Sequence, residues 1–203
     1  MTNLSQALKN TRRGDVSRRA LAAASSLADA ALEDGLLDVA YTMVELPVGE
    51  ALVAATPRGL VRIAYGNVWS ADEVLNDLAA RISPRVIEMP SYFDGVRREL
   101  DEYFAGRRTS FDLPVDWSLT GGFTRKVLKR TARIPYGEVS TYREVAAAAG
   151  SPRGARAAGN ALGSNPIPIV VPCHRVLHSG GGLGGYTGGL EYKQLLLELE
   201  GAR

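Results

Sequence analysis

The chain has 203 residues, of which 45% are hydrophobic and 23% charged, and a formal net charge of +2. This composition is typical of a soluble globular protein with one domain or two small ones, and no run of about 18 apolar residues predicts a membrane span. The first residues carry charge without the apolar core of a secretory signal, and the single cysteine excludes an internal disulfide or a multi-cysteine zinc site. We therefore expect a cytoplasmic protein with no membrane partner.

Positive charge is concentrated in residues 121–175, which hold nine Lys or Arg and two Glu. Residues 1–120 hold 13 basic and 17 acidic side chains, so the excess is local. A basic segment beside an acidic half is typical of a protein with a polyanionic partner. A solvated basic face gives the same pattern, so charge alone leaves both interpretations open.

The N-terminal part of the chain predicts a helical extension followed by a small sheet. Strong helix formers predict a helix over 17–35, and residues 1–14 are expected to fray. Three runs rich in Val, Ile and Tyr follow, separated by Gly and Pro turn signals. They predict an antiparallel meander over residues 39–47, 50–57 and 59–66.

Two helices and a linker are predicted next. The helix over 70–83 has an N-cap serine and acidic residues in its first turn. The helix over 91–106 has apolar residues near helical spacing and a closing glycine. Residues 109–122 carry Pro, Asp and paired glycines, so we interpret them as a loop or linker.

From residue 123 onward the predicted elements are helices with basic faces. One helix is expected over 123–134, where a proline ends it. Thr141 is followed three residues later by Glu144, the capping-box spacing, and predicts a helix over 141–150. A serine–proline pair, suited to the N-cap and N1 positions, then opens a second helix over 151–163. Two short helices joined by a tight glycine turn form a helix-turn-helix.

The second helix of this pair has little side-chain bulk around Arg156. Its small residues are Ala155, Ala157, Ala158, Gly159 and Ala161. Such a helix can approach another surface closely, either a neighbouring helix or a nucleic-acid groove. One long arginine among small residues favours the groove, because a purely packed helix would usually carry more Leu or Ile. A helical corner in an ordinary core is the alternative.

The only cysteine, Cys173, lies in the stretch VVPCHRV and is followed by His174. A lone cysteine is more often a small buried hydrophobe than a nucleophile, and a reactive one needs nearby positive charge or a histidine. Adjacent side chains on an extended segment point in opposite directions, so a bridging water is an easier link between the two than a direct bond. The only other histidine, His178, is too close in sequence for a cysteine protease, and a redox role would need a second cysteine.

Two segments frame this cysteine. Before it, Asn165 precedes Pro166 and Pro168, which indicates a rigid, extended approach whose turn the asparagine can brace. After it, residues 179–190 contain seven glycines, and a helix is expected over 190–201. A Gly-rich tract is usually a flexible linker, but this one lies between the thiol and a helix, which favours a loop close to a bound base or anion.

These stretches resemble the O6-alkylguanine-DNA alkyltransferases, also called the methylated-DNA–protein-cysteine methyltransferases. The strongest similarity is in NPIPIVVPCHRV followed by GGYTGGLEYK, which resembles the active-site region of that family. The matching stretches, in chain order, are LDEYFAGRRTSFDLP (100–114, less sharply), IPYGEVSTY (134–142), ARAAGNALGSNP (155–166), NPIPIVVPCHRV (165–176) and GGYTGGLEYK (184–193). The resemblance covers residues 41–201.

The resemblance implies an α/β (α+β) fold in two parts. It implies a small antiparallel-sheet α/β domain over 39–112 and a DNA-binding and alkyltransferase domain with a minor-groove helix-turn-helix over 113–203. A partly helical extension over 1–38 precedes the usual start of the family, and its role is unassigned. The four-cysteine zinc module that some relatives carry is excluded, because the chain lacks the cysteines for it.

The resemblance also implies DNA repair by direct reversal of damage. The family flips an O6-alkylated guanine out of duplex DNA and moves its alkyl group irreversibly to the Cys173 position, once per protein molecule. Displacement at a small alkyl carbon needs a soft nucleophile such as a thiolate, and a damaged pair opens more cheaply than an intact one. No metal or other cofactor is expected. Activity on O4-alkylthymine, and cooperative assembly of an otherwise monomeric protein on DNA, are left open.

The catalytic roles of the family carry over onto matching positions. Cys173 matches the alkyl acceptor, His174 the base that acts through water, and Glu200 the acid that orients the histidine. Asn165 matches the residue that braces the active-site turn. Tyr142 matches the tyrosine that assists proton transfer and rotates the phosphate.

Further positions match contacts with DNA and with the base. Arg156 matches the arginine that enters the base stack in place of the flipped nucleotide. The other expected DNA contacts are Tyr142, Arg153, Ala155 and Gly159, and the expected base pocket comprises Pro168, Val176, Tyr186, Thr187 and Gly188. The minor groove is only about 6 Å wide, which explains the small residues around the arginine. Asn160 stands where the family often has a smaller residue.

Two other functions compete with this one. A relative that recognises lesions without repairing them would lack the acceptor cysteine, which is present here. A plain helix-turn-helix regulator with a structural cysteine would leave His174, Glu200 and the glycine-rich segment without a role. The alkyltransferase hypothesis accounts for all of these features.

Overall fold

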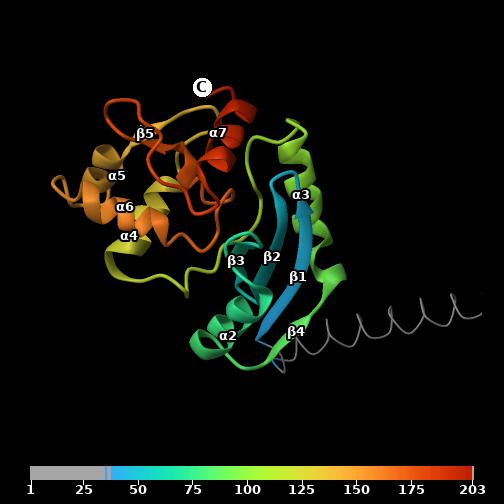
Figure 1. Ribbon diagram of the computed structural model, residues 1–203. Coiled ribbons are helices and arrows are strands. Elements are labelled where there is room, and N and C mark those ends of the chain that lie inside the picture. The colour runs from blue at the N-terminus through green and yellow to red at the C-terminus, as the bar shows by residue number, and fades with distance from the viewer. Residues whose placement is uncertain (1–34, 36–37, 203) are drawn as a thin grey trace, which may run out of the picture.

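The computed structural model describes residue 35 and residues 38–202, so the helix predicted over 17–35 lies, apart from its last residue, outside the described residues. The chain forms two halves side by side, a sheet flanked by helices and then a group of short helices (Figure 1). Among the described residues, no helix is both long enough and apolar enough to cross a membrane.

The first half is built on a four-stranded sheet with the strand order β3-β2-β1-β4. Strands β1 (Val39–Leu46), β2 (Gly49–Thr56) and β3 (Gly59–Tyr65) form the predicted antiparallel meander. Strand β4 (Val86–Glu88) pairs in parallel with β1 and is an addition to the predicted sheet. Its three residues are too few to show the alternation that identifies a strand in a sequence.

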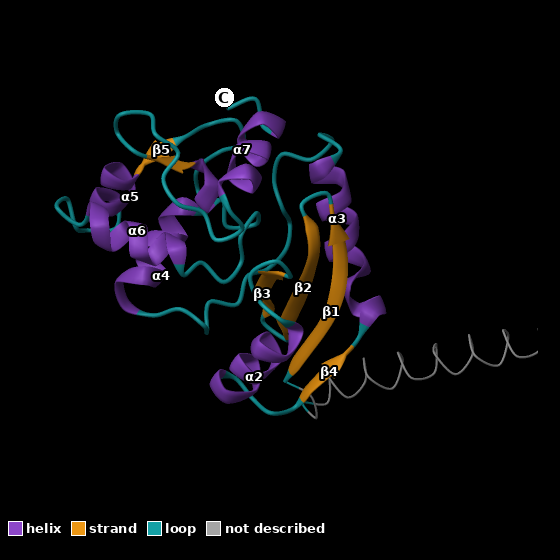
Figure 2. Cartoon of the chain, in the orientation of Figure 1, coloured by secondary structure: helices purple, strands orange, loops and turns teal. Residues whose placement is uncertain are grey.

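Helix α2 (Ala71–Arg81) covers one face of the sheet (Figure 2). It begins after the predicted N-cap, Ser70, whose hydroxyl accepts from the Glu73 amide while the Glu73 carboxylate accepts from the Ser70 amide. This capping box satisfies two backbone groups that a helix start leaves free.

Helix α3 (Asp94–Phe104) covers the other face, after a single 3-10 turn at Pro90–Phe93. Its buried Leu100 and Tyr103 belong to an apolar cluster that extends from the sheet into the C-terminal half. The two halves therefore share one core.

The C-terminal half contains four helices and a short pair of strands. Helices α4, α5 and α6 pack against one another, with α5 starting at the predicted Thr141–Glu144 capping box. The elements are α4 (Gly122–Thr131), β5 (Ser140–Thr141), α5 (Tyr142–Ala148), α6 (Ala155–Gly163), the 3-10 turn η2 (Cys173–Arg175), β6 (Val176–Leu177) and α7 (Leu190–Leu199). Together they confirm the predicted α+β class with a helical C-terminal part.

The predicted start of α6 is wrong. Residues 151–154 form a tight turn instead, in which the Gly154 amide donates to the Ser151 carbonyl at 2.8 Å. The helix begins at Ala155 with Gly154 at its N-cap, where no side chain can cap it. The serine–proline signal therefore marks the turn between α5 and α6 rather than the first turn of α6.

The predicted linker over 109–122 is hydrogen-bonded to strand β3. The Leu60 amide donates to the Pro114 carbonyl, and the Asp116 amide donates to the Leu60 carbonyl, both at 2.8 Å. The buried Asp116 carboxylate also accepts a hydrogen bond of 2.6 Å from the Thr56 hydroxyl. Further along β3, the Ile63 amide donates to the Pro166 carbonyl at 2.8 Å. This strand therefore fixes both the connection between the halves and the segment that leads to the cysteine.

Candidate active site

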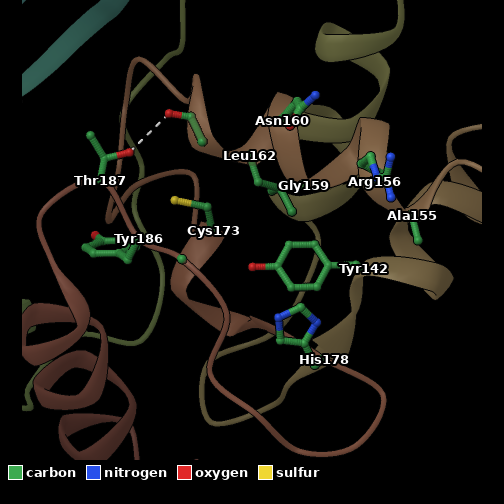
Figure 3. Close-up of a pocket in the computed structure, with 12 residues that line it drawn as sticks. Tyr142, Ala155, Arg156, Gly159, Asn160, Leu162, Cys173, His178, Tyr186 and Thr187 are labelled. Atoms are coloured by element: carbon green, nitrogen blue, oxygen red, sulfur yellow. Dashed lines mark hydrogen bonds between the residues drawn. The ribbon is translucent and has the colours of Figure 1, made fainter.

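A cavity of about 660 Å³ opens between α5, α6 and the loop that precedes α7 (Figure 3). Cys173 lines it and is only 6% exposed, so the sulfur lies toward its inner end. The residues that line it are Tyr142, Ala155, Arg156, Gly159, Asn160, Leu162, Gly163, Cys173, His178, Gly185, Tyr186 and Thr187. None of these twelve is a carboxylate, so the cavity suits an electron-rich or anionic ligand better than a cation.

Asn165 cross-links the turn that presents the cysteine. Its amide nitrogen donates to the Val171 carbonyl at 2.8 Å and to the Cys173 sulfur at 3.1 Å, and its oxygen accepts from the Ile167 amide at 3.1 Å. Within this turn Ile169 is buried with φ of 73°, a left-handed conformation that is strained for a β-branched residue. The asparagine bonds hold the chain in this strained path.

Behind the cysteine, the Glu200 carboxylate is surrounded by donors. One oxygen accepts from the Tyr103 hydroxyl at 2.6 Å and from the Arg175 guanidinium at 2.8 Å, and lies 2.9 Å from His174 Nε2. The other accepts from Arg175 Nε at 2.8 Å. Burial raises the pKa of Glu200, but the hydrogen bonds from His174 and Arg175 outweigh it and lower the pKa to about 2. Glu200 is therefore ionised.

This carboxylate sets the state of the His174 ring. A carboxylate can only accept, so Nε2 carries the proton and Nδ1 keeps its lone pair. Nδ1 is buried and has no hydrogen-bond partner among the described residues. Burial lowers the pKa of His174 below its ordinary value, although the bond to Glu200 opposes this. The ring is therefore neutral at rest, with Nδ1 available to take a proton.

Cys173 rests as a thiol. Burial raises the pKa of Cys173, and the hydrogen bond from Asn165 and the charge of Lys193 oppose it. No direct hydrogen bond joins the sulfur to the His174 imidazole within the described structure, although the two residues lie in the 3-10 turn η2 and not in the extended segment assumed from the sequence. A nucleophilic role thus requires removal of the thiol proton when a substrate binds.

Lys193 was not expected at the site. It is fully buried on α7, and its ammonium donates to the carbonyls of Val176, at 2.7 Å, and Leu183. Burial lowers the pKa of Lys193 to about 8, and the nearby Cys173 opposes this. The ammonium therefore joins the strand after the active-site turn to the glycine-rich loop, and holds positive charge near the sulfur.

Two glycines of the 179–190 segment make room for tyrosines of the chain itself. A Cβ on Gly184, whose φ is +69°, would overlap the Tyr142 hydroxyl. A Cβ on Gly188 would lie 2.7 Å from the Tyr192 ring and 2.9 Å from the Tyr65 ring. Part of this glycine content therefore serves close packing inside the protein rather than contact with a ligand.

The loop is also tied to both halves. The Tyr186 hydroxyl lies 2.8 Å from the Tyr65 hydroxyl on β3. The Thr187 hydroxyl donates to the Gly163 carbonyl at the end of α6, at 3.2 Å. These contacts hold the wall formed by Tyr186 and Thr187, which lies across the cavity from Ala155 and Arg156 (Figure 3).

Comparison with known proteins identifies the family. Residues 39–117 match the 6-O-methylguanine DNA methyltransferase, ribonuclease-like domain, and residues 122–202 match the 6-O-methylguanine DNA methyltransferase, DNA binding domain. The chain belongs to the 6-O-methylguanine DNA methyltransferase family. This confirms the resemblance identified from the sequence.

Individual relatives cover most of the chain. A methylated-DNA–protein-cysteine methyltransferase of Methanosarcina barkeri is 39% identical over 160 residues, which span 79% of this chain and 96% of that protein. The protein of the same name from Mycobacterium tuberculosis is 48% identical over 163 residues, 80% of this chain and 93% of its own. The structure of Mycobacterium tuberculosis OGT in complex with DNA aligns with a TM-score of 0.69 at 38% identity, covering 80% of this chain and 93% of that one.

The site residues expected from the 6-O-methylguanine DNA methyltransferase resemblance fall into three groups by location. Around the cavity lie Tyr142, Ala155, Arg156, Gly159, Cys173, Tyr186 and Thr187, together with Asn160. Behind it, and buried, lie Asn165, His174 and Glu200. The others do not line this cavity: Arg153 is exposed in the turn before α6, Pro168 lines a neighbouring cavity of about 290 Å³, and Val176 and Gly188 are buried.

Three buried residues behind the cysteine were not predicted as part of this site. They are Tyr103, Arg175 and Lys193. For Lys193 a signal exists, because it shares one face of α7 with Leu196, Leu197 and Glu200 at the spacing i, i+3, i+4, i+7, and all four are buried. A lysine and a glutamate on the apolar face of a helix indicate a buried polar site.

Proposed function

We propose that this family member repairs O6-alkylated guanine in duplex DNA by moving the alkyl group to Cys173. The observation that carries the proposal is a buried cysteine at the inner end of a carboxylate-free cavity, beside a neutral histidine bound to an ionised glutamate. The relatives named methylated-DNA–protein-cysteine methyltransferases support the chemistry, and the Mycobacterium tuberculosis structure in complex with DNA supports the partner.

The reaction begins with loss of the thiol proton. The proton of Cys173 passes through a bridging water to His174 Nδ1, which the geometry leaves free to accept it. The ionised Glu200, 2.9 Å from Nε2, stabilises the imidazolium that forms. Asn165 donates to the sulfur and Lys193 supplies positive charge, so both stabilise the thiolate.

Alkyl transfer is then a direct displacement. The thiolate attacks the alkyl carbon, a C–S bond forms, and the bond from that carbon to guanine O6 breaks with its electron pair moving to the base. The base takes up one proton with the help of the Tyr142 hydroxyl, which balances the proton that Cys173 gave to His174, and leaves as ordinary guanine. The product thioether has no further acceptor in a chain with one cysteine, so each molecule reacts once.

The damaged base reaches the cavity by flipping. We infer that α6 enters the minor groove, where Ala155 and Gly159 permit close approach and the exposed Arg156 replaces the flipped nucleotide in the stack. Arg153 lies in the turn before α6 and adds a contact to the DNA backbone. Pro168, Val176 and Gly188 shape the walls behind the base pocket.

All residues in this mechanism belong to one chain, so a monomer suffices for it, and we propose that the protein acts in the cytoplasm. The proposed division is a sheet domain over 39–112 and a DNA-binding and transferase domain over 113–203. Their shared core and the Tyr103–Glu200 bond make the first a support for the second.

Mass spectrometry of the protein after incubation with a duplex containing O6-methylguanine tests the proposal. We expect one added methyl group on the peptide with Cys173, and no addition in Cys173→Ser. With excess duplex, repair should stop at one base per protein molecule. Many repaired bases per molecule, or a methyl group on another residue, would refute the mechanism.

A further inference from the structure

His178 lines the cavity but has no part in the proposed alkyl transfer. Its imidazole packs against the Tyr142 ring, with ring centroids 5.0 Å apart and planes inclined at 43°. On the other side of that ring, a Cβ built on Gly159 would lie 3.8 Å away. Figure 3 shows this order, with Tyr142 between Gly159 of α6 and the His178 imidazole.

A closed turn fixes the backbone that carries this imidazole. The His178 amide donates to the Gly182 carbonyl, and the Gly181 amide donates to the His178 carbonyl, both at 2.8 Å. The side chain is exposed, whereas Cys173 is buried, so the imidazole lies at the outer end of the cavity. Figure 3 marks no hydrogen bond between this imidazole and the other residues that line the cavity.

The surroundings of His178 favour an anion. The cavity lining contains no carboxylate, and Arg156 is exposed on its α6 wall. Lys193 adds a buried positive charge 5.9 Å from the Tyr142 ring centroid. A flipped nucleotide stays joined to the duplex through its phosphates, so the backbone must pass the outer end of the cavity.

We propose that the His178 imidazole donates a hydrogen bond to a backbone phosphate of the flipped nucleotide, with its ring positioned by Tyr142. Imidazole N–H groups are good phosphate donors, and most contacts of DNA-binding proteins go to phosphate and sugar. The inference rests on the proposed function, because it needs a nucleotide in the cavity. It adds a contact from the loop after the active-site turn to those from α6.

Two substitutions distinguish the hydrogen-bond donor of His178 from its aromatic ring. His178→Phe keeps an aromatic ring against Tyr142 without a donor, and His178→Gln keeps a donor without the ring. Each is combined with Cys173→Ser, and binding to a duplex containing O6-methylguanine is measured by fluorescence anisotropy. The same substitutions with Cys173 intact are tested for reaction with free O6-benzylguanine, which has no phosphate.

We expect His178→Phe to weaken duplex binding about tenfold, the loss of one charge-assisted hydrogen bond, and His178→Gln to weaken it less than about threefold. Both should react with free O6-benzylguanine within about twofold of the unsubstituted protein. Unchanged duplex binding in His178→Phe would overturn the contact. So would parallel losses in duplex binding and in the O6-benzylguanine reaction, which would mark the imidazole as a support for Tyr142. Failure of the proposed function is distinct, because the unsubstituted protein would then take up no methyl group.

Discussion

Cys173 separates two regions of opposite character. The cavity side is open and built from small residues of α6 and the glycine-rich loop, with Arg156 and His178 exposed on it. The rear side is a buried polar network in which His174, Glu200 and Lys193 lie within one core. The cavity side can discriminate ligands, whereas the rear side can only change the state of the sulfur.

This difference predicts two classes of variant. A change in the rear network should slow alkyl transfer equally from duplex DNA and from a free base, since both need the thiolate. A change on the cavity side should impair the duplex reaction and spare the free base, because only the duplex has a backbone and a stack to contact. Rates with the two substrates therefore test the division residue by residue.

Glu200→Gln should have the largest effect. It leaves the buried Arg175 without its ionic partner and offers His174 an amide in place of a carboxylate. We expect a loss of about 3–5 kcal/mol in the free energy of unfolding and a fall of about a hundredfold or more in both reactions. Denaturant unfolding and adduct mass spectrometry measure the two effects. Glu198→Gln, exposed on the same helix, is the matched control.

The pH dependence of the free energy of unfolding tests the charge on Glu200. The pKa of Glu200 is lowered in the folded state from an ordinary 4.5 to about 2, so its stabilisation is complete above about pH 4.5. That stabilisation is lost as the pH falls from 4.5 to 2. The free energy of unfolding of Glu200→Gln should therefore change less over this range than that of the unsubstituted protein. Parallel pH curves would contradict the assignment of the charge to Glu200.

Arg156→Ala tests the cavity side. The side chain is exposed on α6 and, in the proposed mechanism, fills the gap left by the flipped base. We expect reaction with an O6-methylguanine duplex to slow about 10- to 100-fold, while reaction with free O6-benzylguanine stays within about twofold. Arg130→Ala removes the same charge from an exposed position on α4 and should have a much smaller effect. Equal losses with both substrates would rule out the stack-entering role.

Local patterns in the sequence indicated most of the cavity side, whereas in the rear network only the family resemblance pointed to His174 and Glu200, and nothing pointed to their partners Tyr103 and Arg175. Tyr142, Arg156 and Cys173 lie in local patterns with a physical meaning, such as a capping box, a helix of small residues and a cysteine beside a histidine. The partners of Glu200 come from distant segments, since Tyr103 lies 97 residues from it in the chain. No local pattern encodes such a contact, and β4 was missed because it consists of three residues.

Lys193→Met tests whether the buried ammonium supports the thiolate. We expect its reaction with free O6-benzylguanine to be about tenfold slower at pH 7, because the thiolate loses a nearby positive charge. The pKa of Lys193 is lowered to about 8, so the unsubstituted protein loses this charge as the pH rises through 8. Above this pH, the rate at which the unsubstituted protein reacts with O6-benzylguanine should level off or fall. The rate of Lys193→Met should continue to rise as the thiol ionises. Lys126→Met, exposed on α4, should keep the original pH profile.

Tyr103→Phe should have the smallest effect and tests how the sheet domain supports the site. It removes one hydrogen bond to a charged acceptor, which is worth about 1.5–3 kcal/mol of unfolding free energy. Tyr136→Phe removes a bond of 2.9 Å to the neutral Leu199 carbonyl nearby, which is worth only about 0.5–1.5 kcal/mol. We expect Tyr103→Phe to lower both alkyl-transfer rates by about threefold, since Glu200 keeps its bonds to His174 and Arg175. Equal stability losses in the two variants, or a loss confined to the duplex reaction, would show that Tyr103 does not act through the buried carboxylate.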